Sequence, residues 1–580
     1  MTARPHGLLV AALAALVLLP NLGGPALWDD DEPRNAACSL AMHASGDWIV
    51  PTFNGRLRVE KPPLVNWVHL AGFAAAGVTE TGARLGSALL TLGTCLLSWR
   101  IAAHLFGPSA GCWAGIAMAT CVWTAVGGRA ATPDAPLIFC TTLALWLFVR
   151  GGRLPGPDGN GWRNGPVRIS AGTATAIGVA CGLAMLAKGP IGLVLPVAAF
   201  LAFACWQAAL DPCRSGSRPA RLAAACGAGW RGVRPLRIAA VALAVAAPWY
   251  AAVGWRTDGE WLRGFFLVHN VGRFAAPMEG HSGSTFFYYP VVILVGMFPW
   301  SIAAALIGRH ACRTAGHGAD GVGGRLLVAW AAAWVLPFAL AATKLPGYVW
   351  PAYPAVAGLT GLFFADWVRR ARPETDRWMR LAWAVLAAVG TALAIGLPLA
   401  ARRFAPGAEW LGLIGVVPLV GAALAWACQS LRSQLAASAV LAGTACVTVA
   451  LLAAAGPAAV SAGRGTRELV SRLPMEGQAP PPLASYRAPP SAAFYAGRLA
   501  DAGRIADLRA RDDLADFLAA HPRAHLLVDA RFEAEVGQVL PADYRVLHAT
   551  TTLPESRRLL LMGPAAPPRL AAADPVAALR

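Results

Sequence analysis

Residues 169–208 read ISAGTATAIGVACGLAMLAKGPIGLVLPVAAFLAFACWQA, and this stretch decides the fold. It contains two apolar runs, 169–187 and 189–208, with Lys188 between them as the one charged residue. A helix needs about 20 apolar residues to cross the hydrocarbon core of a bilayer. The stretch therefore predicts two consecutive membrane spans that are joined at a single cation.

The rest of the chain has the same apolar character. Of its 580 residues, 56% are hydrophobic and 14% are charged, whereas a soluble domain carries about 25% charged residues. These proportions exclude a soluble protein, a disordered chain and a coiled coil. The twelve cysteines are scattered without a C-x-x-C pair, so we interpret them as buried apolar residues and not as a disulfide framework or a thiolate metal site.

Hydropathy predicts thirteen membrane spans. Their approximate limits are 7–27, 82–104, 110–127, 134–150, 169–187, 189–208, 235–255, 288–308, 324–343, 346–365, 378–399, 409–428 and 433–457. The apolar stretch Leu64–Val78 is too short to cross a bilayer, so we expect a helix at the membrane interface. No convincing cleavage site follows Pro20, and the first span is therefore interpreted as an anchor.

Arginine-rich loops give the orientation, because cytoplasmic loops of membrane proteins collect basic residues. Thirteen alternating spans with a cytoplasmic N-terminus put four such loops inside: Arg150, Arg153, Arg163 and Arg168; Arg214, Arg218, Arg221, Arg231 and Arg234; Arg309 and Arg313; Arg369, Arg370, Arg372 and Arg377. This bias explains the net charge of +18 without a nucleic-acid partner. Residues 466–580 hold 14 Arg against 13 Asp plus Glu.

The predicted fold class is an all-α polytopic membrane protein with a small extracytoplasmic α/β domain. Residues 1–463 form the transmembrane part, whose outer loops 28–81 and 256–285 are the expected working face, and residues 464–580 form the soluble domain. In that domain the apolar pattern predicts strands and helices. The strands are Ala484–Arg487, Ala524–Val528, Tyr544–Ala549 and Arg558–Met562, and the helices are Arg511–Ala520 and Arg531–Leu540.

Lysine usage is the most informative internal feature. Of 49 basic residues only three are lysines, Lys61, Lys188 and Lys344, and each lies at the outer end of an apolar segment with a proline within two residues. A compact ammonium reaches into a phosphate site where the planar arginine fork does not fit. The alternative is simple snorkelling at helix ends. The three together favour a site for a lipid-linked phosphate.

Further charged residues accompany these lysines on the outer side. Asp31, Glu32 and Arg34 follow the first span, and Asp134 begins a later one between Pro133 and Pro136. Charges at membrane depth are costly and are usually functional. Glu60 and His281 offer one carboxylate and one imidazole for a divalent cation; a loop histidine that only forms hydrogen bonds is the equal alternative.

In order along the chain, several segments resemble the family 39/83 glycosyltransferases of the GT-C fold. The resemblance is carried by Asp31-Glu32-Pro33-Arg34, Ser45-Gly46-Asp47-Trp48, Glu60-Lys61-Pro62-Pro63, Asp134-Ala135-Pro136, Ala187-Lys188-Gly189-Pro190, Pro248-Trp249-Tyr250, His269-Asn270 with Arg273-Phe274, Pro299-Trp300 and Lys344-Leu345-Pro346-Gly347-Tyr348. Asn35, Arg58 and Val59 stand where the family often has aromatic residues. These departures concern the pocket for the acceptor or the sugar.

The resemblance implies an enzyme that transfers a sugar from a polyprenyl-phosphate carrier at the outer face of the bacterial inner membrane, to lipid A or to protein. Asp31 matches an essential acidic position, and Glu60 and His281 match proposed metal positions. The positions near the carrier phosphate are Lys61, Lys188, Arg273 and Tyr348, and we add Lys344 to that set and Asp134, Glu32 and Arg34 to the catalytic set. A transporter and a scaffold are the competing classes; a transporter should carry its charges near the bilayer midplane.

Overall fold

The computed structural model describes residues 3–28, 30–153, 167–210, 217–272, 287–316, 320–473, 481–499, 505–552 and 557–565. The chain divides into two compact units. The first, here called the transmembrane unit, comprises Met1–Pro25, Trp48–Pro51 and Leu57–Val460. The second unit comprises Ala26–Asp47, Thr52–Arg56 and Ser461–Arg580. The second unit therefore combines part of the first outer loop with the C-terminal residues.

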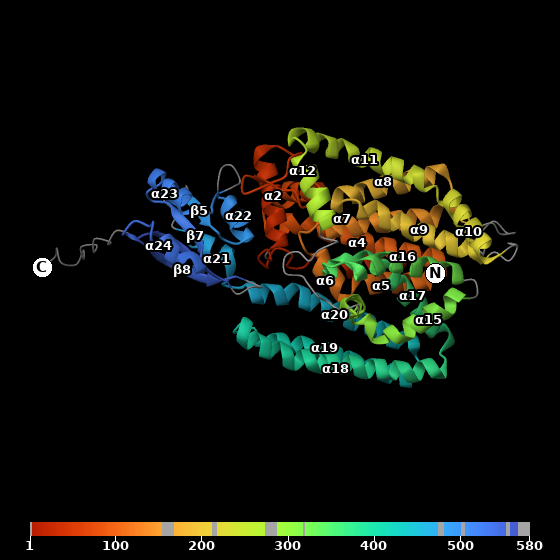
Figure 1. Ribbon diagram of the computed structural model, residues 1–580. Coiled ribbons are helices and arrows are strands. Elements are labelled where there is room, and N and C mark those ends of the chain that lie inside the picture. The colour runs from red at the N-terminus through yellow and green to blue at the C-terminus, as the bar shows by residue number, and fades with distance from the viewer. Residues whose placement is uncertain are drawn as a thin grey trace. The chain divides into compact units, whose positions relative to one another are not determined.

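The transmembrane unit is a bundle of apolar helices (Figure 1). Within the described ranges, nine helices are long and apolar enough to cross a membrane. They are α4 (Glu80–Phe106), α7 (Asp134–Gly151), α8 (Ala171–Lys188), α9 (Ile191–Ala209), α11 (Pro235–Arg256), α16 (Gly321–Leu340), α18 (Pro373–Phe404), the 3₁₀-helix η4 (Glu409–Gly415) continued by α19 (Val416–Ser430), and α20 (Gln434–Ser461). The chain is a multi-pass membrane protein.

Two bent helix pairs raise this number to eleven when each pair is counted as one span of the described residues. The first pair is α5 (Pro108–Ala119) with α6 (Val122–Gly128), bent by 57°. The second is α14 (Tyr288–Gly296) with η2 (Trp300–Ala303) and α15 (Ala304–Gly316), bent by 120°. The other two predicted spans correspond to α1 (Ala3–Leu18) and to η3 (Pro346–Ala352) with α17 (Tyr353–Arg370). Neither is both long and apolar enough to count among the membrane-crossing helices.

The helix expected over Leu64–Val78 is observed as α3 (Leu64–Ala76). Three segments predicted as connections are also helical, namely α10 (Arg218–Val233), α12 (Glu260–Arg263) and the π-helix η1 (Gly264–Gly272). Two short strands, β3 (Gly152–Arg153) and β4 (Arg168–Ile169), pair antiparallel. Helix α10 occupies part of the arginine-rich loop between α9 and α11. The second outer loop therefore begins as ordered helix, with η1 of the rare π type that is frequent at functional sites.

Small residues bring α8 close to its neighbour α11. Gly178 and Gly182 lie one turn apart, and a Cβ at either position would come within 2.7 Å of Val241 or Val245 on α11. Such small-xxx-small spacing allows close helix packing in membranes. Helix α8 begins at Ser170, whose hydroxyl accepts from Thr173 N at 3.0 Å. It ends at Lys188 because Gly189 adopts a φ of +81° and Pro190 follows.

The second unit contains a five-stranded sheet of order β6-β5-β7-β9-β8. The strands are β5 (Leu483–Tyr486), β6 (Ala506–Leu508), β7 (His525–Asp529), β8 (Tyr544–Thr551) and β9 (Arg558–Pro564). Strands β6, β5 and β7 are parallel, and β9 is antiparallel to both β7 and β8. The unit also contains α2 (Asp31–Ser45) and the strand β1 (Thr52–Phe53), which β2 (Arg56–Leu57) follows.

Helices cover both faces of this sheet, so the middle residues of the central strand β7, Leu526–Val528, are apolar on both faces. Leu526 and Val528 pack in one core, with α23 (Arg511–Ala520) and α24 (Glu533–Gly537). Leu527 packs in the other core, with α21 (Gly465–Ser471) and α22 (Pro490–Gly497). The predicted α/β domain and the limits of α23 are confirmed, whereas β6 and α22 were not predicted because each is too short to show a periodic pattern. A 3₁₀ turn, η5 (Ala530–Phe532), starts the helix predicted over 531–540, which ends early, at Gly537.

Candidate functional site

Lys188 and Asp134 form an ion pair at the centre of the candidate site. Lys188 is the last residue of α8, and Asp134 is the first residue of α7. Their side chains are 12% and 23% exposed, respectively. Each charge lies at the helix end that the macrodipole favours, since the carboxylate is at an N-terminus and the ammonium at a C-terminus. The pair therefore holds a largely buried cation where two helix ends meet.

The 3₁₀-helix η3 places an aromatic ring beside this pair. The Lys188 Nζ lies 5.2 Å from the centroid of the Tyr348 ring, a distance at which a cation and a π face attract. Gly347 permits this approach, because a Cβ there would lie 3.1 Å from Oδ2 of Asp134. Phe338 of α16 supports the ring of Tyr348 at a centroid distance of 4.9 Å. Lys188, Asp134 and Tyr348 are thus brought together from three parts of the chain.

Lys344 lies just before η3, and its ammonium donates a hydrogen bond to the carbonyl of Ala341 at 2.9 Å. This bond covers an open carbonyl at the C-terminus of α16. A lysine has three donors, so the contact leaves capacity for a further partner. The bond agrees with a structural role for Lys344 as well as with the predicted phosphate contact.

The ordered start of the second outer loop packs against the end of α8. A Cβ on Gly189 would lie 2.6 Å from the ring of Phe265 in η1, so the close approach of these two segments depends on a glycine. Asn270 donates from Nδ2 to the carbonyl of Phe265 at 2.7 Å, within the π-helix. On the other side, the Tyr250 hydroxyl of α11 donates to the carbonyl of Met185 at 3.2 Å. The residue after Lys188 is thereby held by η1 of the second loop, and the last turn of α8 by α11.

Three tryptophan indoles hold the first outer loop within the transmembrane unit. Trp67 donates to the carbonyl of Trp48 at 3.0 Å, Trp249 to that of Ile49 at 3.1 Å, and Trp261 to that of Arg58 at 2.8 Å. None of these indoles was predicted as a site residue. The signal for them was the high tryptophan content of the outer loops and of the helices that border them.

Glu60 and Lys61 follow this anchored segment. The Glu60 carboxylate accepts from Nε of Arg58 at 3.2 Å, and the Arg58 side chain is only 4% exposed. Lys61 is half-buried and precedes two buried prolines at the start of α3. Arg58 stands where the family often has an aromatic residue, and in this structure its guanidinium neutralises the carboxylate of Glu60.

The residues Asp31, Glu32 and Arg34 belong to the second unit and open α2. Asp31 is exposed, whereas Glu32 is buried and accepts from the backbone N–H of Trp28 at 2.9 Å. Two carboxylates in the first turn of a helix are favoured by its dipole. Of the two, Asp31 is the carboxylate that solvent reaches, and Glu32 also orders the preceding turn.

Two predicted site residues, Arg273 and His281, lie outside the described residues. Within the described ranges, no group of three His, Cys, Asp or Glu side chains could hold a metal ion. The metal site of Glu60 and His281 stays a prediction. Arg129, five residues before Asp134, donates to the carbonyls of Val17, Leu18 and Asn21 at 3.3, 2.9 and 3.2 Å and covers the C-terminus of α1.

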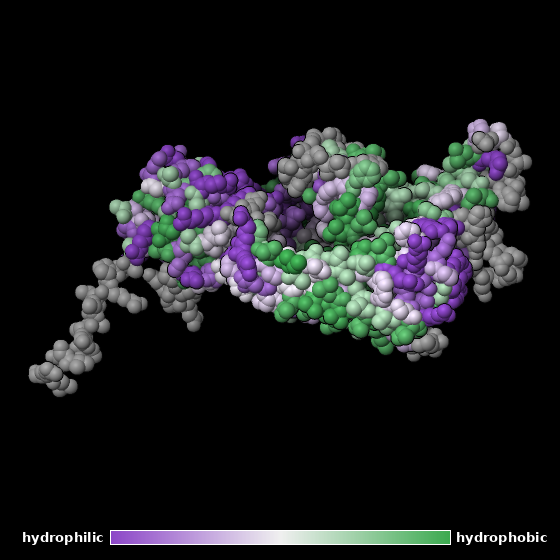
Figure 2. All heavy atoms as spheres, turned by 90° about the horizontal axis from the view of Figure 1, so that it is seen from below, coloured by the Kyte–Doolittle hydropathy of each residue, from purple (hydrophilic) through white to green (hydrophobic). Residues whose placement is uncertain are grey.

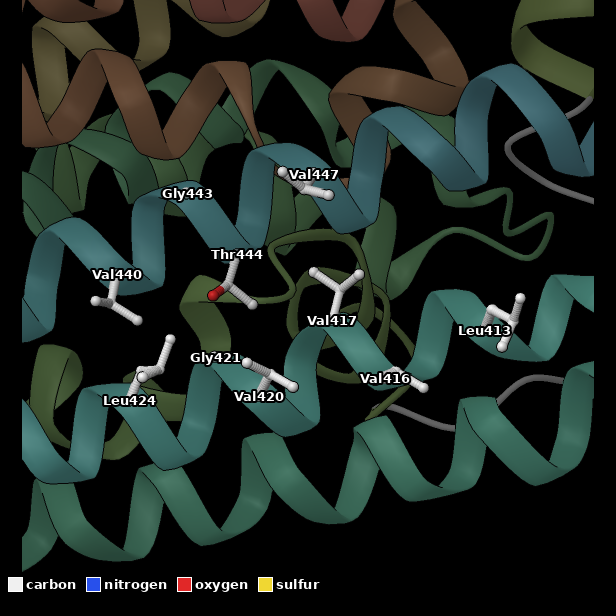
Figure 3. A pocket seen from close by; sticks show the side chains of 10 residues that line it. All are labelled: Leu413, Val416, Val417, Val420, Gly421, Leu424, Val440, Gly443, Thr444 and Val447. Carbon is white, nitrogen blue, oxygen red and sulfur yellow. The ribbon is translucent and has the colours of Figure 1, made fainter.

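An apolar cavity of about 600 Å³ lies between α19 and α20 (Figure 3). Valine side chains from both helices and two leucines line it, with Thr444 as the one hydroxyl group among them. It contains no charged or metal-ligating side chain. The cavity is therefore suited to an apolar chain and not to chemistry.

Comparison with known proteins gives matches in sequence. The family model for dolichyl-phosphate-mannose-protein mannosyltransferase matches residues 60–214. The undecaprenyl phosphate-alpha-4-amino-4-deoxy-L-arabinose arabinosyl transferase of Edwardsiella ictaluri is 30% identical over 377 residues, which are 64% of this chain and 61% of the relative. The enzyme of the same name from Pseudomonas aeruginosa PAO1 is 30% identical over 365 residues, covering 61% and 58%. The chain thus matches about three fifths of the length of these curated relatives.

The fold has a counterpart among solved structures. The crystal structure of ArnT from Cupriavidus metallidurans bound to undecaprenyl phosphate has a TM-score of 0.75 with this chain, at 22% sequence identity, and the match covers 97% of this chain and 99% of that one. At this identity the likeness concerns the fold alone. Together, sequence and fold confirm the resemblance of this chain to the GT-C glycosyltransferases of families 39 and 83.

Proposed function

We propose that this protein is an integral-membrane glycosyltransferase that moves a sugar from a polyprenyl-phosphate carrier to an envelope acceptor, in an aminoarabinose-type transfer to a phosphate of lipid A. The observation that carries the proposal is the cluster of Lys188, Asp134 and Tyr348 at the ends of buried helices. The named relatives of similar sequence are arabinosyl transferases whose names include undecaprenyl phosphate.

Lys188 is the proposed contact of the carrier phosphate. As the sugar departs, the phosphate gains negative charge, and a preorganised cation stabilises that charge most where water is excluded. One ammonium donor of Lys188 is used by Asp134, which leaves two for phosphate oxygens. Asp134 is therefore a positioning residue that fixes the ammonium before the substrate arrives, and Tyr348 adds the attraction of its ring face.

Lys61, Lys344 and Arg273 complete the proposed phosphate-binding set. Lys61 follows the anchored first loop, and Lys344 leads into η3, which carries Tyr348. Three or four cations around one phosphate would lower the free energy of the leaving group without proton transfer. Each of these side chains is proposed to stabilise the phosphate through its positive charge and not to donate a proton to it.

Asp31, with Glu32 and Arg34, is proposed to serve the acceptor. If the acceptor is a hydroxyl group, Asp31 acts as the general base within hydrogen-bond distance of the attacking oxygen. If the acceptor is a lipid phosphate, the nucleophile is already ionised, and Asp31 orients the acceptor or a cation. Its exposure in the second unit agrees with a group that meets a substrate.

A divalent ion held by Glu60 and His281 is a separate proposal. The carboxylate is present, but Arg58 already neutralises it, so a metal ion would have to compete with that guanidinium. Elemental analysis of the purified protein by plasma mass spectrometry, with and without Glu60→Gln, tests it: a stoichiometric metal that the variant loses supports the ion.

The second candidate is a protein O-glycosyltransferase, which is favoured by the family model that matches residues 60–214. It would use the same carrier and the same phosphate contacts but a serine or threonine hydroxyl as acceptor. Asp31 would then be essential as a base. The two candidates differ only in the acceptor, so the test has to identify the product.

Mass spectrometry of lipid A and of envelope glycoproteins, from cells with and without the gene, makes that distinction. A pentosamine mass on lipid A phosphate that is lost with the gene supports the aminoarabinose-type transfer. Altered glycoproteins with unchanged lipid A support the second candidate. Complementation with Lys188→Ala should fail under either, while Arg100→Ala, an exposed charge on α4, should complement.

The localisation is proposed as the bacterial inner membrane, with the site and the second unit on the periplasmic side. Alkaline phosphatase, which is active only outside the cytoplasm, is fused after Ala209 and after Ser471 for the test. We expect activity from the second fusion alone, and activity from the first would contradict the orientation.

A further inference from the structure

Two arginine-rich loops that lie far apart in the sequence share one pocket of the transmembrane unit. The pocket has a volume of about 600 Å³ and is formed mainly by α15, α17 and the start of α18. Its charged lining comprises Arg309, Arg313, Arg369, Arg370 and Arg372 against Asp320, Asp366 and Glu374. With His310 neutral, five positive and three negative charges leave a net charge of +2.

The acids do not neutralise all of the arginines. Asp366 accepts from Arg370 Nε at 2.8 Å and from Arg369 Nη2 at 3.2 Å. Glu374 pairs with Arg309 at 3.4 Å, and both side chains of that pair are exposed. In the part of the chain that the structure describes, Arg313 and Arg372 form no ion pair. Two guanidinium groups of the pocket are therefore available to an anion.

One wall of the pocket is apolar and continues along a membrane helix. Trp378 of α18 lines the pocket and is 52% exposed. Leu381 and Val385 lie three and seven residues further on the same helix, hence on the same face, and are also exposed. Only 17% of the most apolar stretch of α18 is buried inside the protein. In Figure 2 the hydrophobic surface over α18 and α19 ends in a hydrophilic patch where α17 leads into α18.

We propose that this pocket binds one anionic phospholipid, with the headgroup phosphate against Arg313 and Arg372 and an acyl chain along the Trp378 face of α18. Guanidinium groups bind phosphate through paired N–H donors, and basic pockets between membrane helices bind anionic headgroups. A free phosphate ion would use the arginines but leave the apolar wall uncovered. A zwitterionic lipid would cover the apolar wall, but its headgroup has no net negative charge to match the positive charge of the pocket.

The site is separate from the proposed transfer, because none of its lining residues belongs to the cluster around Lys188. By the positive-inside rule, it lies at the cytoplasmic end of the helices, since it is built from two of the four loops assigned to that side. Occupancy by a lipid would join α15 to α18 through shared contacts, in a region where the arginines otherwise repel one another.

The test is native mass spectrometry of the full-length protein, delipidated in detergent and titrated with dioleoyl-phosphatidylglycerol or dioleoyl-phosphatidylcholine. We expect one phosphatidylglycerol to bind more tightly than any phosphatidylcholine. Arg313→Gln with Arg372→Gln should weaken that site on the order of tenfold or more, because each basic residue contributes about 1 kcal/mol to anionic-lipid binding. Arg313→Lys with Arg372→Lys should largely retain it.

The matched control is Arg402→Gln with Arg403→Gln, two exposed arginines at the opposite end of α18, which should leave the tight lipid in place. Circular dichroism and size-exclusion chromatography verify that each variant is folded. Equal binding of both lipids, or equal phosphatidylglycerol binding by wild type and the glutamine variant, would overturn the proposal. So would displacement of the lipid by millimolar inorganic phosphate, which would indicate a site for the free ion.

Discussion

The Lys188 ammonium is paired with the Asp134 carboxylate, although the two residues are 54 positions apart in the chain. The pair connects the C-terminus of α8 to the N-terminus of α7, where both helix dipoles favour the charges that are present. The same lysine faces the ring of Tyr348. A cation held from two sides in this way is preorganised, as the proposed contact with a phosphate requires.

Replacement of Asp134 by asparagine should lower the turnover of the proposed sugar transfer by about 10- to 100-fold, because Lys188 loses the group that orients it. Lys188→Ala should be at least as damaging. Since the two residues act as one unit, the double variant should be no worse than Lys188→Ala alone. The measurement is transfer from a polyprenyl-phosphate sugar by purified protein in detergent. Additive losses would show that Asp134 acts independently of Lys188.

Gly189→Ala should destabilise the protein and impair the site together. The backbone conformation of Gly189, with φ of +81° and ψ of −155°, costs a non-glycine residue about 1–3 kcal/mol, and the added Cβ would collide with Phe265. Differential scanning fluorimetry should show a lower melting temperature. Gly396→Ala on α18 is the control, since its Cβ would meet no atom within 4 Å, and removal of a helix glycine should stabilise by about 0.5–1 kcal/mol. Equal melting temperatures of the two variants would contradict this.

Trp261→Phe should loosen the first outer loop. The substitution keeps most of the buried ring but removes the N–H that donates to the carbonyl of Arg58, a bond worth about 1 kcal/mol. Hydrogen exchange in the segment around residues 48–60 should rise about fivefold, as expected when a local opening costs 1 kcal/mol less. Trp255→Phe should leave exchange unchanged, because Trp255 is 86% exposed. Unchanged exchange in both variants would mean that the loop is held by other contacts.

Arg531→Gln should destabilise the second unit in a pH-dependent way. Burial raises the pKa of Asp529, but the hydrogen bonds and the charge of Arg531 outweigh burial and hold the pKa below its ordinary value. A carboxyl with a depressed pKa in the folded state contributes stability above its unfolded pKa and loses it as the pH falls through its folded pKa. The variant should therefore be less stable near pH 7, by about 1 kcal/mol because Arg531 is largely exposed.

That difference should shrink as the pH falls through the unfolded pKa of Asp529, near 3.8, and should vanish below its folded pKa. Hydrogen exchange of β7 amides in the full chain, followed from pH 7 to pH 3, measures it. Arg545→Gln, an exposed change on β8, controls for the loss of one positive charge. A stability difference between Arg531→Gln and wild type that is as large at pH 3 as at pH 7 would mean that Arg531 acts by packing and not through Asp529.

Local patterns in the sequence were sufficient for much of this protein. Long apolar runs predict membrane helices because the bilayer requires about 20 such residues, and each of the nine spans above corresponds to a predicted one. The helix Arg511–Ala520 was predicted at its observed limits because its apolar residues are periodic. The short β6 and α22 were missed, since a few residues do not establish a period. The lysines stood out because their chemical type departs from the composition of the whole chain.

Tertiary structure alone decided which distant groups meet. The partner of Lys188 is 54 residues away, and the indoles that anchor the first loop come from α3, α11 and α12. Two arginine loops that the sequence places only on the same side share a single pocket because α15, α17 and α18 converge. Such contacts depend on how helices pack side by side, through glycines such as Gly178 and Gly182. The pattern of small residues on one helix does not specify which other helix packs against it.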